Sequence, residues 1–197
     1  EPKKLIILTF IAGMAAVPLA LPLEQYAKDH LVGNFSVFTA WALIEEALKY
    51  AMAAIFILWR NAVDEVSDYV IYMITVALGF AAAENILFLI DPVSSGYFAT
   101  SFFTGDIRFI GSTLLHVVAS SAIGFSLAFS FKRGGGGRIL AAAIGLILAV
   151  ALHTAFNMLI ISEGTSTTFT AFSLVWTGAV VFFAAFEVLK YFQYKNL

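Results

Sequence analysis

Six long apolar runs, separated by short polar stretches, make up most of the chain. Within each run the apolar residues are continuous instead of alternating, which disfavours transmembrane β-strands. A helix needs about 20 apolar residues to cross the hydrocarbon core of a bilayer. The pattern therefore predicts an all-α, polytopic membrane protein, one domain over residues 1–197 built as a bundle of about six helices. The expected spans are Leu5–Leu23, Phe35–Trp59, Tyr69–Ile90, Phe109–Phe131, Ile139–Ile161 and Thr168–Phe192.

The polar stretches predict loops at both ends of this bundle. Glu24–Asn34 and Asp91–Arg108 are expected as outer loops, and residues 132–138, which contain four consecutive glycines, as a flexible cytoplasmic loop. Lys3 and Lys4 precede the first apolar run, so a cleaved signal peptide is the alternative to a first span. The run is longer than a typical signal-peptide core, which favours the span.

Composition strengthens the membrane assignment and removes several functions. Hydrophobic residues make up 61% of the chain and charged residues 12%, whereas a soluble domain has about 25% charged residues. There is no cysteine, which excludes disulfides, thiolate metal sites and a cysteine nucleophile. The net charge of −2, without a basic stripe, argues against a nucleic-acid partner and leaves the lipid bilayer as the expected surroundings.

Lysine and arginine are distributed unequally between the two ends of the predicted bundle. One end carries eight of them and the other end carries Lys28 and Arg108. Because cytoplasmic loops are enriched in basic residues, we expect a multi-pass protein of the cell membrane with both termini in the cytoplasm. The residues at the predicted cytoplasmic end are Lys3, Lys4, Arg60, Lys132, Arg133, Arg138, Lys190 and Lys195.

Five ionisable side chains interrupt the apolar runs: Glu45, Glu46, Glu84, His116 and His153. A charged residue at mid-bilayer costs at least about 2.5–3.5 kcal/mol, so such residues usually face a polar cavity and serve a function. Counted along the predicted spans, they lie at similar depths, about 9–15 Å below the outer ends. The spans alternate in direction, so this agreement indicates one site in the outer half of the membrane.

The first group of these residues is Glu45, Glu46 and Lys49. Glu45 and Lys49 share a helix face, while Glu46 points about 100° away, so the two carboxylates can serve different partners. Two buried carboxylates suit general acid–base chemistry. The alternative is a structural Glu–Lys pair that holds helices together.

The second group is Glu84 with Asn85, after the small residues of Gly79–Ala83 that permit close helix packing. Glu84 is a candidate metal ligand or proton-relay carboxylate, and Asn85 could orient it or donate to a substrate. The alternative is a packing seam in which Glu84 binds a neighbouring helix.

The third and fourth groups are His116 with Ser120 and His153 with Asn157, each pair one helical turn apart. Imidazole can bind zinc, accept a proton or donate to an oxyanion, and an asparagine amide can also stabilise an oxyanion. Interhelical hydrogen bonding is the alternative role for each histidine.

Glutamate with histidine leaves two chemistries open, and both hydrolyse peptide bonds. Glu84, His116 and His153 could hold Zn²⁺, with Glu45 as the base and Glu46 as second choice for the base or as a ligand. Alternatively, Glu45 could activate water without a metal, with His and Asn side chains such as Asn157 stabilising the oxyanion.

The four groups resemble, in order, the four motifs of PrsW-type intramembrane proteases, which are related to the CAAX prenyl endopeptidase/bacteriocin-processing superfamily. The resemblance covers roughly residues 41–160. In the CAAX branch the first motif ends in Arg and the second in His, whereas Lys49 and Glu84 stand at these places here. The resemblance therefore implies the PrsW branch, catalysis by the glutamate pair and a histidine, and site-1 cleavage of single-span anti-sigma factors near the outer face.

Two functions from other classes compete with this hypothesis. A non-catalytic scaffold or membrane chaperone, like the related scaffold subunit of γ-secretase, would keep polar residues for helix assembly. A small proton-coupled transporter would open its site to both sides, but paired broken helices are not evident: Pro18 and Pro22 both lie in the first span. Cleavage assays and proton-flux measurements would separate the three.

Overall fold

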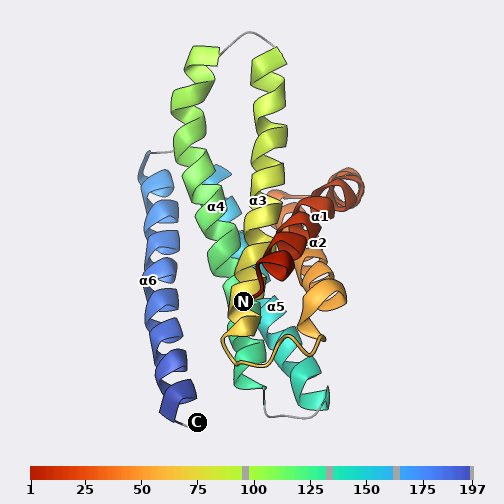
Figure 1. Ribbon diagram of the computed structural model, residues 1–197. Helices are drawn as coiled ribbons and strands as arrows, with labels where there is room; N and C mark the ends of the chain where they lie inside the picture. The colour runs from red at the N-terminus through yellow and green to blue at the C-terminus, as the bar shows by residue number, and fades with distance from the viewer. Residues whose placement is uncertain (95–97, 132–134, 162–164, 196–197) are drawn as a thin grey trace.

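The computed structural model describes residues 1–94, 98–131, 135–161 and 165–195, with side chains described for 1–88, 109–131, 135–160 and 169–191. These ranges contain helices and no strand (Figure 1), which confirms the all-α prediction. The elements are α1 (Lys3–His30), α2 (Asn34–Ala53), the π-helical turn η1 (Ala54–Leu58), α3 (Asp68–Ser94), α4 (Phe98–Phe129), α5 (Gly135–Ile161) and α6 (Thr165–Lys195).

Five of the helices, α1 and α3 to α6, are long and apolar enough in their described parts to cross a membrane. The α2 helix is not among them because it carries Glu45, Glu46 and Lys49; a sixth span there stays a prediction. Large apolar side chains cover the outside of the bundle, as expected for contact with lipid, among them Ile7, Ile55, Ile139, Ile147, Phe169 and Phe183.

The α3 helix lies at the centre of the bundle, with α4 beside it, α1 crossing it and α6 at one edge (Figure 1). Tyr72, Met73 and Val76 of α3 are completely buried and pack in one apolar cluster with Ile123 of α4. Because α3 and α4 are held by this core, the polar side chains they carry one or two turns further along are fixed in direction.

Where α1 crosses α3, the two backbones touch at two glycines. Gly13 of α1 lies against the backbone of α3, and Gly79 of α3 lies against the backbone of α1. A Cβ added at Gly13 would lie 2.0 Å from the carbonyl oxygen of Val76, and one added at Gly79 would lie 2.0 Å from that of Phe10. The close helix approach expected around Gly79 is therefore confirmed, and α1 is an integral part of the bundle.

The two expected outer loops are largely helical, which corrects the prediction. The α1 helix continues to His30, so residues 31–33 alone connect it to α2, and Gly33 takes a positive φ of 87° that favours glycine. Within Asp91–Arg108, residues 91–94 extend α3 and residues 98–108 begin α4. Figure 1 shows the two helices rising together past the rest of the bundle. Ser, Thr and Gly are weak helix formers, but extending an existing long helix avoids the cost of nucleation.

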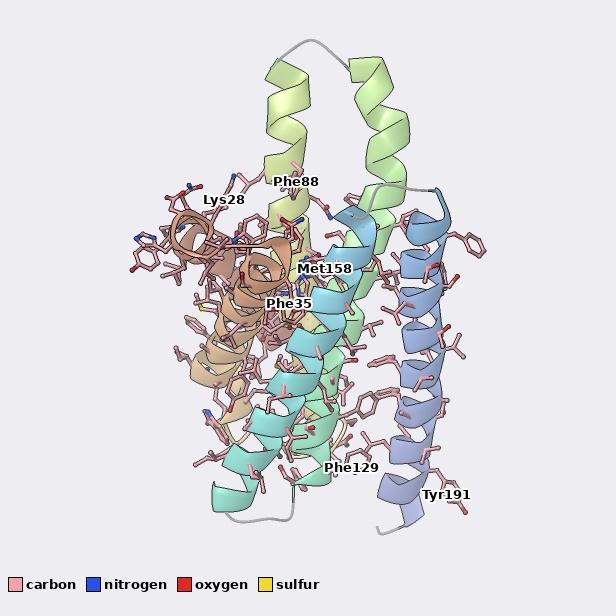
Figure 2. The ribbon with its side chains drawn as sticks, turned by 180° about the vertical axis from the view of Figure 1, so that it is seen from behind. Lys28, Phe35, Phe88, Phe129, Met158 and Tyr191 are labelled. Atoms are coloured by element: carbon pink, nitrogen blue, oxygen red, sulfur yellow. The ribbon has the colours of Figure 1, made fainter. Side chains whose placement is uncertain are left out.

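The cytoplasmic loop expected at 132–138 is also shorter than predicted. The α5 helix begins at Gly135, so three of the four glycines form its first turn, and residues 132–134 lie outside the described part. The order of the helices places Lys28 and Phe88 at one end of the bundle and Phe129 and Tyr191 at the other (Figure 2), as the predicted topology requires. Which end faces the cytoplasm stays a prediction.

Candidate active site

The midpoint of α2 carries three ionisable side chains that are buried inside the bundle. The side chains of Glu46 and Lys49 are 0% exposed and that of Glu45 is 8% exposed. Lys49 stands one turn after both glutamates, so its Nζ lies 2.7 Å from Glu46 Oε1 and 3.6 Å from Glu45 Oε2. The sequence order Glu-Glu-x-x-Lys thus builds a compact charge cluster on one helix.

Glu46 joins three helices through hydrogen bonds to both of its carboxylate oxygens. Its Oε1 accepts from Lys49 Nζ, and it lies 3.0 Å from Nδ1 of His153 on α5. Its Oε2 accepts from the Ser120 hydroxyl of α4 at 2.7 Å. A buried carboxylate with this many donors is stabilised as an anion and fixes its neighbours in place.

His116 of α4 is held on both ring nitrogens. Its Nε2 lies 2.6 Å from Glu84 Oε2 of α3, and its Nδ1 lies 2.7 Å from Lys49 Nζ. A carboxylate accepts and an ammonium donates, so we assign the ring proton to Nε2 and the lone pair to Nδ1. By the same reasoning, the bond between His153 Nδ1 and Glu46 leaves the lone pair of His153 on Nε2.

Glu45 differs from its neighbour because its Oε2 is buried and has no hydrogen-bond partner among the described residues. This oxygen faces the two lone pairs: it lies 3.7 Å from His116 Nδ1 and 3.8 Å from His153 Nε2. The two imidazole rings meet edge to face, with centroids 5.2 Å apart. A buried polar atom without a partner is costly, so its retention points to a ligand or a reaction at this place.

Glu45, His116 and His153 together form a group that fits a divalent metal ion, since one donor atom of each lies within 4.8 Å of the others. The set of two histidines and one glutamate is found in catalytic zinc sites, which keep a position open for water. The remaining nitrogen of each imidazole is bonded to a carboxylate, Glu84 or Glu46, as in most metal-binding histidines.

The geometry differs from the expected ligand set in one residue. Glu84 was predicted as the third ligand, but it contacts Nε2 of His116, the nitrogen opposite the one that faces Glu45. Its side chain is 25% exposed. The structure thus places Glu84 where it orients His116, and it places Glu45 with the two histidines.

Of three other predicted site residues, one bonds to a glutamate of the site and the other two do not, among the described residues. Ser120 contacts Glu46, as described above. Asn85 does not bond to Glu84 and instead donates to the Thr113 hydroxyl of α4 at 3.2 Å. Asn157 lies one turn beyond His153 on α5 and is half-buried; it takes part in none of the hydrogen bonds described here.

Two residues that contact the site, Glu24 and Phe80, were not among the site residues predicted from the sequence, although Phe80 opens the motif that contains Glu84 and Asn85. Glu24 was assigned to an outer loop, but it lies on α1, close enough to Glu84 and Lys49 for an electrostatic interaction. The absence of a helix-ending glycine before Gly33 could have indicated this. The Phe80 ring packs against the His116 ring, with centroids 5.3 Å apart, and Lys49 Nζ lies 4.3 Å from the Phe80 centroid; its place four residues before Glu84 was a usable signal.

Residues 1–189 match the family described as PrsW family intramembrane metalloprotease. The chain belongs to this family. The resemblance found in the four motifs is therefore confirmed, and family membership makes the protein an intramembrane protease.

Three relatives carry the name protease PrsW. That of Bacillus subtilis (strain 168) is 24% identical over 163 residues, which cover 81% of this chain and 71% of the relative. That of Geobacillus kaustophilus (strain HTA426) is 31% identical over 46% of this chain and 41% of the relative. That of Oceanobacillus iheyensis is 36% identical over 46% of this chain and 43% of the relative. No solved structure matches the chain significantly.

Proposed function

We propose that this chain hydrolyses peptide bonds in single-span membrane proteins near the extracytoplasmic face, as in site-1 cleavage of anti-sigma factors. The observation that carries the proposal is the Oε2 of Glu45, which is buried, has no hydrogen-bond partner among the described residues and faces two imidazole lone pairs. This oxygen lies inside a bundle in which five helices are long and apolar enough to cross a membrane. The family to which the chain belongs is one of intramembrane metalloproteases.

The proposed metal ligands are Oε2 of Glu45, Nδ1 of His116 and Nε2 of His153. A zinc ion bound there would polarise the scissile carbonyl and acidify a water molecule. This replaces Glu84 of the sequence hypothesis by Glu45, because Glu84 engages the opposite nitrogen of His116.

The side chains of this site orient the two histidines, and one of them would accept a proton in a metal-free enzyme. Glu84 and Glu46 hold the two imidazole rings in the tautomers that turn their lone pairs toward Glu45. Glu45 is a ligand when a metal is bound, and in a metal-free enzyme the same oxygen would accept the proton of the attacking water. Asn157, one turn beyond His153, is proposed to stabilise the oxyanion of the tetrahedral intermediate.

Lateral access for a substrate helix is supported by a groove between α2 and α5 with a volume of about 450 Å³. Figure 2 shows two of its residues near each other, Phe35 of α2 and Met158 of α5. The groove is apolar and reaches Thr154, the residue after His153, whose buried hydroxyl has no hydrogen-bond partner among the described residues. Ala151 and Ala155 also line it, and small residues at this spacing let a helix approach closely.

The proposed substrate is a peptide helix because a lipid acyl chain offers no acceptor for the Thr154 hydroxyl. A locally unwound substrate segment has free carbonyl oxygens. The groove therefore fits the membrane segment of a single-span protein next to its cleavage position.

The proposed extracytoplasmic position of the site rests on two arguments. Glu24, which interacts with Glu84, lies close to the His30 end of α1, and this end of the bundle carries few basic residues in the predicted topology. The bond that is cleaved in a single-span substrate would therefore lie close to the outer membrane face.

The test is reconstitution of the purified protein in vesicles with a panel of single-span membrane proteins, combined with elemental analysis. We expect about one zinc per chain and cleavage that stops on chelation and returns with zinc. Cleavage should fail in Glu45→Gln and His153→Ala and persist in Glu187→Gln, whose side chain is 72% exposed on α6. Cleavage that survives Glu45→Ala, Glu46→Ala and His153→Ala would contradict the proposal. Cleavage that resists the chelator would contradict the role of a metal in it.

A further inference from the structure

The ammonium group of Lys49 contacts two of the three atoms to which the metal is assigned. Its Nζ lies 2.7 Å from Nδ1 of His116 and 3.6 Å from Oε2 of Glu45. The side chain is 0% exposed, so the ammonium is part of the interior of the site. Lys49 thus places a positive charge beside the atoms that would bind a cation.

The contact with His116 excludes a metal at the same nitrogen. Nε2 of His116 carries the ring proton and donates a hydrogen bond to Glu84, so Nδ1 has one lone pair, which accepts a hydrogen bond from Lys49. A single lone pair cannot accept this hydrogen bond and bind a metal at the same time. Metal binding at His116 therefore requires Lys49 to leave this nitrogen.

Lys49 has other partners to which it can shift without leaving the bundle. Its Nζ also donates to Oε1 of Glu46 at 2.7 Å, and it lies 4.3 Å from the centroid of the Phe80 ring. A salt bridge together with a cation–π contact keeps a buried ammonium compensated. Neither contact involves His116, so both partners remain next to Lys49 when it releases this nitrogen.

Three carboxylates belong to this site: Glu45 and Glu46 lie within 4 Å of Lys49 Nζ, and Glu84 contacts the far nitrogen of His116. Without a cation among them they would repel one another in a medium of low dielectric. Lys49 compensates this charge when no metal is bound, which keeps the ligands assembled.

We propose that Lys49 is a built-in cation that occupies part of the metal position, preserves the ligand cluster before loading, and lowers the affinity for zinc because it must be displaced. The inference rests on the proposed function, which assigns the metal to Glu45, His116 and His153. It deepens that function by making metal loading an exchange of one cation for another.

The test is zinc affinity, measured by competition with a chromophoric chelator on purified protein in detergent. We expect Lys49→Met to bind zinc about tenfold more tightly or better, the factor expected when one charged hydrogen bond no longer competes. The double variant Glu46→Gln with Lys49→Met removes both partners of the buried pair, so it protects the test against a folding defect. Lys190→Met is the matched control, because Lys190 pairs with Glu187 at the same spacing on an exposed face.

A second measurement is thermal unfolding with and without zinc. Without metal, we expect Lys49→Met to unfold at a lower temperature than the native chain. Added zinc should raise the unfolding temperature of this variant by more than it raises that of the native chain. If the native chain binds zinc and both Lys49 variants bind it equally tightly or more weakly, the inference is overturned. The proposed metal site is unaffected by that result. Absence of zinc binding in the native chain and all variants would overturn the metal site and the inference with it.

Discussion

Two neighbouring carboxylates on α2 form the two halves of the polar site and differ in how they are bonded. The Glu46 half is saturated, with hydrogen bonds to Lys49, Ser120 and His153 from three helices. The Glu45 half keeps an oxygen without a hydrogen bond among the described residues, next to both imidazoles. Both side chains are buried in the same bundle, so the membrane alone does not explain the difference.

The comparison shows how a structural charge can be told from a reactive one. A buried charge that holds the fold uses its whole hydrogen-bonding capacity, because every unused acceptor costs free energy. A group kept for chemistry must leave a position free for substrate, water or metal. By this criterion we propose that Glu46 is mainly a positioning residue and that Glu45 is the reactive one.

The largest expected effect is on cleavage in the variant Glu45→Gln. We expect cleavage to fall by at least about 10²–10⁴-fold, which is the usual contribution of a catalytic acid–base group, because the variant also replaces the carboxylate to which the metal is assigned. In the metal-free protein the midpoint of thermal unfolding should change less than in Glu46→Ala, because Glu45 Oε2 makes no hydrogen bond with the described part of the chain and lies 3.6 Å from Lys49 Nζ, against 2.7 Å for Glu46 Oε1. A large loss of stability in this variant would contradict the division into two halves.

The second variant, Glu46→Ala, should lower the free energy of unfolding. Removing one partner of a buried ion pair costs about 3–5 kcal/mol, because Lys49 is left without its closest anion. The free energy of unfolding, measured by denaturation in mixed micelles, should fall by this order. Glu187→Ala removes the matching pair on exposed α6 and should cost less than about 1 kcal/mol; equal losses in both variants would show that burial does not matter here.

Ser120→Ala removes a single hydrogen bond of Glu46 and should therefore destabilise the protein less than Glu46→Ala. Its hydroxyl donates to the Glu46 carboxylate at 2.7 Å inside the bundle, and a hydrogen bond to a charged group contributes about 1.5–3 kcal/mol. We expect a loss of stability in this range, measured in the same denaturation assay. Ser173→Ala, whose hydroxyl bonds to the backbone of its own helix at an exposed position, is the control and should be close to neutral.

The smallest expected effect concerns the groove between α2 and α5, which is the proposed path of the substrate. Ala151→Phe fills part of it, and we expect about a tenfold rise in KM for a single-span substrate, equivalent to about 1.4 kcal/mol. Zinc affinity should not change. Ala184→Phe adds the same ring to an exposed position of α6 and should leave KM unaltered; if both variants raise KM equally, the groove is not the substrate path.

Much of the site was predictable because its residues interrupt apolar runs. The depth argument placed Glu45, Glu84, His116 and His153 at one level, and their contacts confirm that they converge. The assignment of Glu84 as the third ligand differs from the geometry, because helix spacing does not show which side of an imidazole a carboxylate meets. That depends on the rotation of α3 against α4, and the close crossing at Gly79 helps to set this rotation.

The loops were less predictable than the spans for a related reason. Residues 98–108 contain Ser, Thr and Gly and look like a loop in a sequence, yet they continue α4. Local propensity is worth only a few tenths of a kcal/mol for most residues. Extension of a long helix beside a packed partner outweighs it.

The sequence by itself determined that the chain lies in a membrane, where its helices run and which few ionisable residues they carry, because run length and the cost of burying charge are properties of linear order. Tertiary structure decided which of two adjacent glutamates is saturated and which stays open, and that Lys49 lies against the nitrogen of His116 that a metal would use. These choices depend on helix rotation and crossing, and a difference of about 100° between successive residues becomes a difference in chemistry only when other helices surround them.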